Sequence, residues 1–230
     1  HDAVDVRGSA CKALGSLVDS LKEAEPAIIG LSLSRVTDEM YAAGTTLSRR
    51  LGAAQCLKEL GVHLSGDEVF ASLEFLLAQG FLDTDPDVRT SMMAAGVAVI
   101  GAADAVKAEA ILPIMEKYLE NPKDRGLSEE QYDHVRLGAV VCIGATAQHL
   151  DPSNPKVVSI VKTLLEVLMT PSEVVQRSVS DRLPPLVKSL LGINKEFVEE
   201  TVAALLETCL TGETYGDRRG AEYGLSGCVK

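Results

Sequence analysis

The chain has 230 residues, a formal charge of −11 at pH 7 and a sequence pI of about 4.9. Hydrophobic residues make up 46% of it, which argues against an intrinsically disordered chain. Extensive contact with nucleic acid requires a basic face, so the acidic balance predicts little direct nucleic-acid contact by this segment. The longest uncharged run, residues 90–103, is shorter than the roughly 20 residues of a membrane span, and no membrane association is expected.

Five cysteines lie far apart in the sequence, and none belongs to a C-x-x-C pair. They are Cys11, Cys56, Cys142, Cys209 and Cys228. Each falls within an apolar helical pattern, where a free thiol behaves as a small hydrophobic group. The odd count and the wide spacing are typical of a protein from a reducing compartment and not of a disulfide framework.

An arginine-centred motif recurs along the chain at intervals of 39 to 47 residues. Its arginines are Arg7, Arg50, Arg89, Arg136, Arg177 and Arg218. A period of roughly 40–47 residues made of two helices is the signature of HEAT and armadillo arrays. We therefore predict an all-α fold, a HEAT-repeat α-solenoid of about five to six stacked helix pairs that is open at both ends.

The pattern predicts one continuous array and no separate domains. Its approximate units are 1–22, 23–64, 65–104, 105–150, 151–191 and 192–230. The chain is expected to open on the second helix of a unit, over residues 5–21, and to stop within another second helix. Stable solenoids need polar capping repeats at their ends, and neither end supplies one. We therefore expect a fragment of a longer solenoid.

The two helices of a unit differ in their hydrophobic pattern. First helices over residues 110–120, 157–168 and 197–210 carry apolar residues at helical spacing on one face. Second helices over residues 91–103 and 137–147 are apolar nearly all round, which predicts that they are buried between other helices.

Capping residues mark several predicted helix starts. In chain order these are Ser65 with Glu68, Asp85-Pro86, Ser128 with Gln131, Asn154-Pro155, and Thr170-Pro171 with Glu173. Further along, Pro184-Pro185 should break the fifth second helix, with residues 186–191 continuing as a separate piece. The last predicted helix holds Gly216, Gly220, Gly224 and Gly227, which we expect to permit tight packing.

Two kinds of basic residue are singled out. The six repeat arginines recur in every unit, so we interpret them as structural, each pairing with an acidic residue of a neighbouring layer. Candidate partner contacts are Arg49, Arg219, and Lys123 with Arg125 in the enlarged loop at residues 121–127. An acidic stretch from Glu59 to Asp87, which contains no Lys or Arg, reads as a solvated helix face or as a docking patch for a basic partner.

No residue is predicted to be catalytic, to bind a cofactor or to hold a metal. The histidines lack metal-ligand spacing, and the glycine-rich string near the C-terminus does not follow a strand. No nucleophile elbow is present. The sequence therefore predicts that this segment is not an enzyme and binds no small molecule.

Two strings in the last third of the chain resemble a known family. Residues 171–180 read PSEVVQRSVS and are followed by LPPLV at 183–187, and residues 215–227 read YGDRRGAEYGLSG. Both resemble repeats of the family of general control non-derepressible protein one. Segments at 85–89 and 132–141 are closest to its plant-like members. The resemblance is good from about residue 67 to residue 230 and faint before it.

The resemblance implies an internal fragment of a very large, cytosolic, polysome-associated HEAT-repeat protein. Such a fragment is a non-catalytic scaffold segment on ribosomes. It helps to activate the amino-acid-starvation kinase that acts on translation initiation factor two. The resemblance implies that the kinase is contacted through other parts of the full protein.

A HEAT adaptor of another class is the alternative. A nuclear transport receptor or a phosphatase scaffold would use an acidic surface to bind a basic partner, and the stretch from Glu59 to Asp87 suits that interpretation. Association with ribosomes in the cell separates the two hypotheses.

Overall fold

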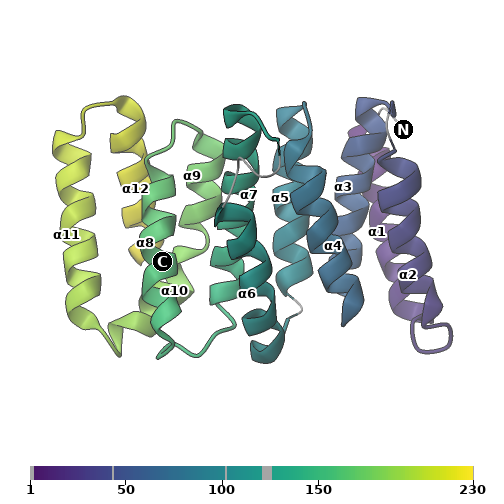
Figure 1. Cartoon of the computed structure of the whole chain (residues 1–230), viewed down its shortest axis with the longest axis horizontal. Coiled ribbons are helices and arrows are strands. Elements are labelled where there is room, and N and C mark those ends of the chain that lie inside the picture. The colour runs from purple at the N-terminus through teal and green to yellow at the C-terminus, as the bar shows by residue number, and fades with distance from the viewer. Residues whose placement is uncertain (1–2, 43, 102, 121–125, 230) are drawn as a thin grey trace. The chain divides into compact units, whose positions relative to one another are not determined.

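The computed structural model describes residues 3–42, 44–101, 103–120 and 126–229, apart from the side chains of residues 119 and 120. All regular structure within these ranges is helical, as Figure 1 shows. In chain order the elements are α1 (Val4–Leu21), α2 (Ala27–Ser34), the π-helical η1 (Arg35–Met40), α3 (Leu47–Gly61), α4 (Asp67–Ala78), the 3₁₀ turn η2 (Gly80–Leu82), α5 (Pro86–Gly101), α6 (Ala105–Glu120), α7 (Glu129–Ala147), α8 (Pro155–Leu168), α9 (Glu173–Ser180), α10 (Leu183–Leu191), α11 (Lys195–Thr211) and α12 (Tyr215–Val229). The predicted all-α class is confirmed.

The chain forms two compact units. The first contains His1–Asp104 and Tyr118–Gly138, and the second contains Ala105–Lys117 and Ala139–Lys230. Helices α6 and α7 therefore contribute residues to both units. Within each unit, consecutive helices are joined by short loops, as is usual for neighbouring antiparallel helices.

In the first unit, α3 packs between α1 and α5, while α4 packs against α5. The approach of α3 to α5 depends on Gly61, because a Cβ at this position would lie 2.8 Å from the backbone nitrogen of Val99. Leu57 and Leu60 of α3 are fully buried in the resulting core, together with Leu73 of α4. The second helix α5 thus lies among other helices, as the apolar pattern of residues 91–103 predicts.

In the second unit, α12 packs against α8, α9, α10 and α11. Three glycines spaced four and three residues apart form its contact face. A Cβ on Gly220 would lie 1.9 Å from the carbonyl oxygen of Leu168, and a Cβ on Gly227 would lie 2.8 Å from that of Ser180. A Cβ on Gly224 would lie 2.9 Å from side-chain carbons of Leu168 and Leu205. The expected tight packing is confirmed at these three glycines, with backbone against backbone at Gly220 and Gly227, whereas a Cβ on Gly216 would meet only ordinary contacts at 3.6 Å.

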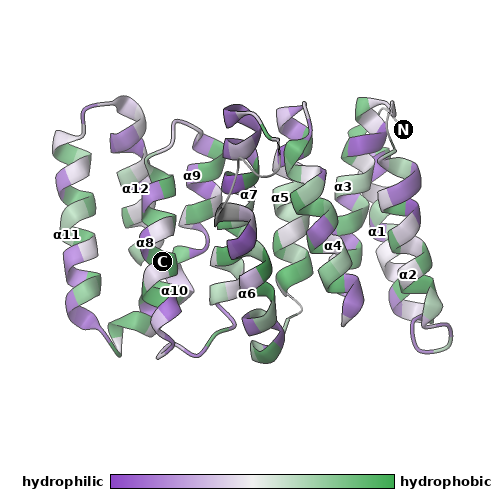
Figure 2. Cartoon of the chain, in the orientation of Figure 1, coloured by the Kyte–Doolittle hydropathy of each residue, from purple (hydrophilic) through white to green (hydrophobic). Residues whose placement is uncertain are grey.

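The first helices bury one side, as their spacing predicts. In α8 the buried residues are Val157, Ile160, Val161, Leu164, Val167 and Leu168. Figure 2 shows hydrophobic and hydrophilic residues on the same helix in α8 and α11, in keeping with this amphipathic pattern. Burying a side chain of this size contributes about 1.5–3 kcal/mol relative to its exposure, so the stripe accounts for much of the stability of the helix.

The proline pair divides the fifth second helix as predicted. Helix α9 ends at Ser180 and α10 begins at Leu183, with both prolines in its first turn. Proline is tolerated there because the first N–H groups of a helix have no intrahelical acceptor.

Three of the five predicted caps are present. At the start of α4 only half of the predicted capping box forms: Glu68 accepts a hydrogen bond from the backbone N–H of Ser65, but the N-cap is Gly66 and makes no side-chain cap bond. Ser128 and Gln131 form the full reciprocal capping box, at 3.0 and 3.2 Å. Asn154 accepts a hydrogen bond from the backbone N–H of Lys156. The prediction that Thr170 caps α9 is wrong, since Ser172 stands at that position and makes no side-chain cap bond. Pro171 consequently lies outside the helix.

Candidate functional site

The repeat arginines share a position in four helices. Arg7, Arg50, Arg89 and Arg218 are each the fourth residue of their helix, in α1, α3, α5 and α12 respectively. Arg136 is instead the eighth residue of α7. In α9 the fourth residue is Gln176, and Arg177 is the fifth. The recurrence is therefore one of helix position as well as of residue type.

Three of these arginines close the loop that leads into their own helix. The Nη1 atom of Arg50 donates to the carbonyl oxygen of Thr45 at 3.0 Å, and that of Arg89 donates to the carbonyl oxygen of Asp83 at 2.7 Å. The Nη1 atom of Arg218 donates to the carbonyl oxygen of Gly212 at 2.6 Å. Each acceptor lies five or six residues before its arginine. A guanidinium is suited to this task because it presents several donors in a fixed plane.

Gln176 does the same in α9 and also reaches the next repeat. Its Nε2 atom lies 2.7 to 2.9 Å from the carbonyl oxygens of Leu168, Thr170 and Gly216, and its two hydrogens are shared among these three acceptors. The residue is fully buried. Because Gly216 belongs to α12, Gln176 connects the loop before α9 to the following repeat. This role of Gln176 was not predicted from the sequence, which instead indicated a structural role for the neighbouring Arg177.

Arg50 makes the ion pair between layers that was expected of every repeat arginine. Its Nε atom lies 2.9 Å from Oδ2 of Asp83, whose side chain is 3% exposed. The hydroxyl of Tyr41 donates to the same oxygen at 2.5 Å, and the backbone N–H of Asp85 donates to Oδ1 at 2.9 Å. Burial, followed by the hydrogen bond to Asp83, raises the pKa of Tyr41, so its hydroxyl stays protonated as a donor. Asp83 thus ties three segments of the first unit together.

The acidic stretch from Glu59 to Asp87 contains both exposed and buried carboxylates. Asp67, Glu74 and Asp87 are exposed, as a solvated face requires, whereas Asp83 is buried. Asp83 therefore cannot contribute to a docking patch for a basic partner, and that interpretation rests on fewer carboxylates than the sequence indicates.

Arg219, a candidate partner contact, is largely engaged within the chain. Its Nε donates to Oε1 of Gln176 at 2.8 Å and its Nη2 to the carbonyl oxygen of Pro171 at 2.7 Å. Its Nη1 lies 3.5 Å from Glu173, and its side chain is 20% exposed. Arg177 remains on the surface, where it pairs with Glu173 and donates to the hydroxyl of Tyr223. Arg219 therefore fastens α12 to the start of α9.

The adjacent arginines Arg218 and Arg219 give a matched pair of variants. We expect Arg219→Ala to lower the free energy of unfolding by about 2 kcal/mol, because it removes charge-assisted bonds to α9 and leaves the buried Gln176 oxygen without its donor. Arg218→Ala removes one exposed bond within its own loop and should cost under about 1 kcal/mol. Urea titration followed by circular dichroism measures both. Equal losses would show that Arg219 does not link the helices.

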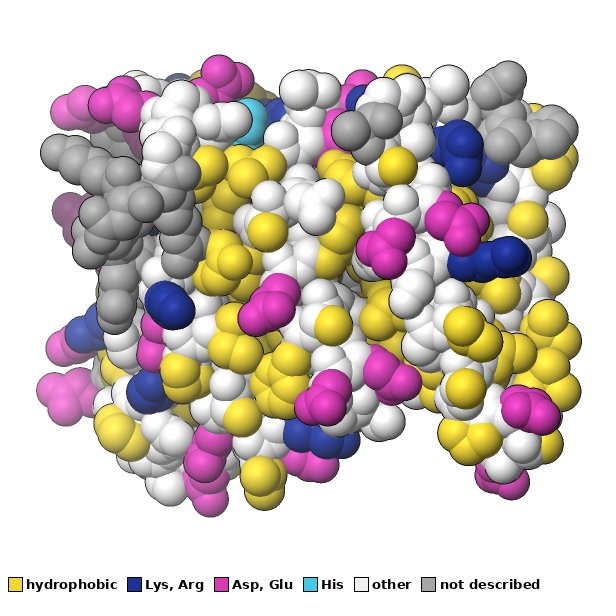
Figure 3. Space-filling model, turned by 45° about the vertical axis from the view of Figure 1, so that its right-hand side comes forward, with side chains coloured by type: hydrophobic (Ala, Val, Ile, Leu, Met, Phe, Trp, Pro, Cys, Tyr) yellow, Lys and Arg dark blue, Asp and Glu magenta, His cyan; other side chains and the backbone are white. Residues whose placement is uncertain are grey.

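Of the remaining candidate partner contacts, Arg49 belongs to the described residues. Arg49 is exposed, and its guanidinium donates to the carbonyl oxygen of Glu39 at 3.1 Å. Lys123 and Arg125 lie outside the described residues. On the face drawn in Figure 3, lysine and arginine side chains form separate small groups among apolar and acidic ones.

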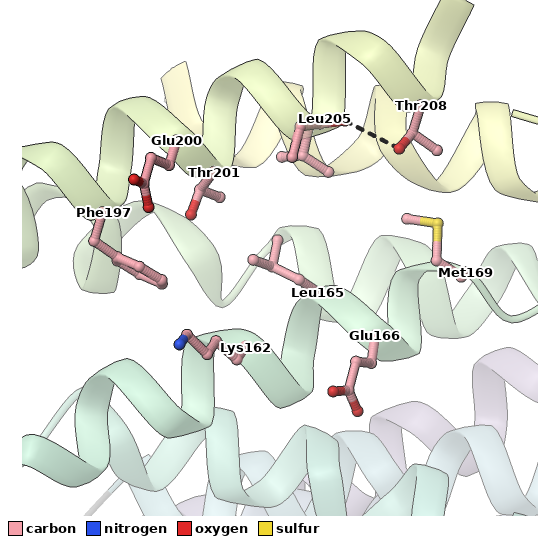
Figure 4. Close-up of a pocket in the computed structure, with 10 residues that line it drawn as sticks. Lys162, Leu165, Glu166, Met169, Phe197, Glu200, Thr201, Leu205 and Thr208 are labelled. Atoms are coloured by element: carbon pink, nitrogen blue, oxygen red, sulfur yellow. Dashed lines mark hydrogen bonds between the residues drawn. The ribbon is translucent and has the colours of Figure 1, made fainter. Parts of the chain in front are cut away.

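A groove of about 510 Å³ runs between α8 and α11 in the second unit. Leu165 of α8, and Met169 directly after that helix, face Phe197 and Leu205 of α11 across it, as Figure 4 shows. The charged residues at its rim are Lys162, Glu166 and Glu200, and the Lys162 ammonium lies 5.7 Å from the centre of the Phe197 ring. The lining is mostly apolar, so the groove offers area for contact and no arrangement of acid, base and nucleophile.

Within the described part of the chain, no three His, Cys, Asp or Glu side chains lie closely enough together to hold a metal ion. Every helix of the described ranges is too short or too polar to span a lipid bilayer.

Comparison with known proteins places the repeats in a family. A family model described as "Stalled ribosome sensor GCN1, HEAT repeats" matches residues 1–148. The human protein named stalled ribosome sensor GCN1 is 32% identical over 245 residues, which cover all of this chain and 9% of that protein. The Arabidopsis thaliana protein ILITYHIA is 37% identical over 238 residues, covering all of this chain and 8% of that protein.

The match extends to fungi. The Saccharomyces cerevisiae protein named eIF-2-alpha kinase activator GCN1 is 31% identical over 166 residues, which cover 71% of this chain and 6% of that protein. The chain thus spans less than a tenth of the length of these relatives. No solved structure matches it. The helix pairs, the recurring fourth-position residue and the family match together show that this chain belongs to the GCN1 HEAT-repeat family.

Proposed function

We propose that this chain is a non-catalytic scaffold segment of a ribosome-associated translational regulator. The regulator promotes activation of the amino-acid-starvation kinase that acts on translation initiation factor two. The observation that carries the proposal is the family match over residues 1–148. Relatives in two kingdoms are named for sensing stalled ribosomes or for activating the eIF-2-alpha kinase. The family assignment favours this function over a transport receptor or a phosphatase scaffold.

The packing supports a role in presenting surface. Successive repeats are joined by buried bonds such as those of Gln176 and Asp83, so the exposed side chains of each unit stand on a packed core. The groove between α8 and α11 adds an apolar contact area on one such surface. A scaffold needs these properties, whereas an enzyme would need a reactive cluster. We propose that the segment works in the cytoplasm, on polysomes, through protein contacts.

Sedimentation of the full-length native protein tests the whole-protein proposal. In a polysome gradient we expect the protein to migrate with polysomes and, after nuclease digestion, to collapse onto nuclease-resistant ribosome pairs. Migration only in the light fractions, at low salt and after cross-linking, would contradict the proposal and bring the transport or adaptor alternative forward.

We propose further that Arg49, with Lys123 and Arg125, contributes to a partner contact. Reversing these three charges to glutamate in the full-length protein should lower the ribosome-bound fraction severalfold at moderate salt, because exposed charges act through screened attraction. The control reverses the exposed Lys12, Lys58 and Lys188, which changes the net charge by the same amount. An equal loss in the control would assign the effect to total charge and remove these residues from the contact.

A further inference from the structure

Two cysteines from neighbouring repeats face each other in the first unit. The Sγ atoms of Cys11 in α1 and Cys56 in α3 are 2.7 Å apart, although the residues are 45 positions apart in the sequence. Both are free thiols, and they are only 3% and 6% exposed. A disulfide bond has a length of about 2.0 Å, so a relative movement of less than about 1 Å separates the pair from covalent contact.

The packing of α1 on α3 brings the thiols to the same level. A Cβ on Gly15 of α1 would lie 3.3 Å from the Cβ of Glu59, so these helices approach closely one turn beyond Cys11. Cys11 also lies against the backbone of α3, with its Sγ 3.6 Å from the carbonyl oxygen of Gly52. Gly52 is four residues before Cys56, and Gly15 is four residues after Cys11. The small residues therefore hold the pair between two points of close helix contact.

The contact between the two thiols favours a thiolate on one of them. The hydrogen bond from Cys56 lowers the pKa of Cys11, and the positive charge of Arg7, one turn earlier, acts in the same direction against burial and Glu59. The pKa of Cys56 is raised by its contact with Cys11 and by burial. Although both sulfurs are largely buried, they share with redox-sensing pairs the placement of a thiolate beside a second cysteine, in which the first sulfur attacks the oxidant and the second resolves the product.

We propose that Cys11 and Cys56 form a reversible modification site that a hydroperoxide oxidises to a disulfide joining α1 to α3. The Cys11 thiolate attacks one oxygen of hydrogen peroxide, the O–O bond breaks, and hydroxide leaves as Cys11 becomes a sulfenic acid. The Cys56 sulfur then attacks the Cys11 sulfur, the S–O bond breaks, and water leaves with the Cys56 proton. In sum, two thiols are oxidised by two electrons and one peroxide is reduced to two waters. A dithiol reductant reverses the reaction.

The other three cysteines are internal controls. Cys142 is fully buried, and burial raises its pKa to about 12. Burial also raises the pKa values of Cys209 and Cys228, which lie on α11 and α12 in the second unit. A raised pKa reduces the fraction of thiolate, the form that attacks peroxide. None of these three thiols contacts a second cysteine within the described residues, so each lacks the resolving partner that Cys56 provides for Cys11.

Thiol counting on the full 230-residue chain tests the proposal. The reduced protein is exposed briefly to hydrogen peroxide, quenched with catalase, denatured and labelled with N-ethylmaleimide. We expect most molecules to pass from five labelled cysteines to three, with the peptides of Cys11 and Cys56 cross-linked. Dithiothreitol should restore five. Continued labelling of both residues, or a link between other cysteines, would overturn the proposal.

Single cysteine substitutions distinguish the attacking role of Cys11 from the resolving role of Cys56. Cys56→Ser should stop the reaction at a sulfenic acid on Cys11 that dimedone traps, Cys11→Ser should form neither product, and Cys209→Ser should behave as the wild type. Peroxide should raise the melting temperature of the wild type by several degrees, because the bond closes a long loop, and leave that of the doubly substituted protein unchanged. Peptide mapping of the wild type decides the question even where a variant folds poorly. Further oxidation of Cys11 while Cys56 still labels would contradict the pairing.

Discussion

Replacing Gly220 with alanine is expected to lower the free energy of unfolding of the second unit by about 3 kcal/mol. The added Cβ would lie 1.9 Å from the carbonyl oxygen of Leu168 and 2.8 Å from its carbonyl carbon. Both are backbone atoms, so no side-chain rotation relieves the clash and α12 must move away from α8. Urea or thermal unfolding monitored by circular dichroism measures the change.

Gly216 of the same helix is the matched control. A Cβ at this position would meet Pro171 Cα at 3.6 Å, which is ordinary van der Waals contact. Gly216→Ala should be neutral or stabilise the protein by up to about 1 kcal/mol, because alanine loses less conformational entropy in a helix than glycine does. If Gly220→Ala unfolds no more easily than Gly216→Ala, α12 does not pack backbone to backbone as described.

Replacing Asp83 with alanine is expected to destabilise the first unit by about 3 kcal/mol. The substitution removes the ion pair with Arg50 and the acceptor of the Tyr41 hydroxyl, and it frees the loop N–H of Asp85. Breaking a buried pair is costly because the remaining polar groups stay partly desolvated. Arg50 is 24% exposed on its side chain and recovers some hydration, which keeps the loss at the lower end of the usual range.

The same loss should be coupled to Arg50. In a double-mutant cycle with Arg50→Ala, the double variant should be more stable than the sum of the single losses predicts, by at least about 1 kcal/mol. Asp87→Ala is the control, since Asp87 is exposed in the first turn of α5 and should change stability by under about 1 kcal/mol. Additive losses at positions 50 and 83 would show that the pair does not act as a unit.

The features predicted correctly from the sequence are those that local chemistry determines. Pro184 and Pro185 remove backbone donors, so the end of one helix and the start of the next follow from the residues themselves. Ser128 and Gln131 form their capping box within four residues. The amphipathic stripe of α8 follows from helical periodicity, because every buried position lies on one face.

Contacts between repeats were harder to foresee. Asp83 reads as one more carboxylate of an acidic stretch, and only the fold brings Arg50 and Tyr41 to it. Gln176 and Arg219 make the contacts between repeats that were expected of their neighbours Arg177 and Arg218. One residue along a helix turns a side chain by about 100°, and this rotation decides which repeat the side chain contacts. An alignment of the arginines by sequence alone does not account for this rotation of the side chain about the helix axis.

The pairing of two cysteines and the extent of the family match could also not be predicted from short sequence motifs. Cys11 and Cys56 meet because one repeat stacks on the next, and their wide spacing in the sequence conceals this. The resemblance of short motifs is faint before residue 67, yet the family model matches from residue 1 to residue 148.

Cross-linking mass spectrometry on the native full-length protein bound to nuclease-resistant ribosome pairs tests the central claim most directly. A lysine-reactive reagent reports neighbours of exposed residues such as Lys156, Lys162 and Lys195. If this segment presents binding surface on the ribosome, its lysines should link to ribosomal or ribosome-bound proteins. Links from these lysines only to the protein's own chain, while other parts of it link to the ribosome, would contradict that role.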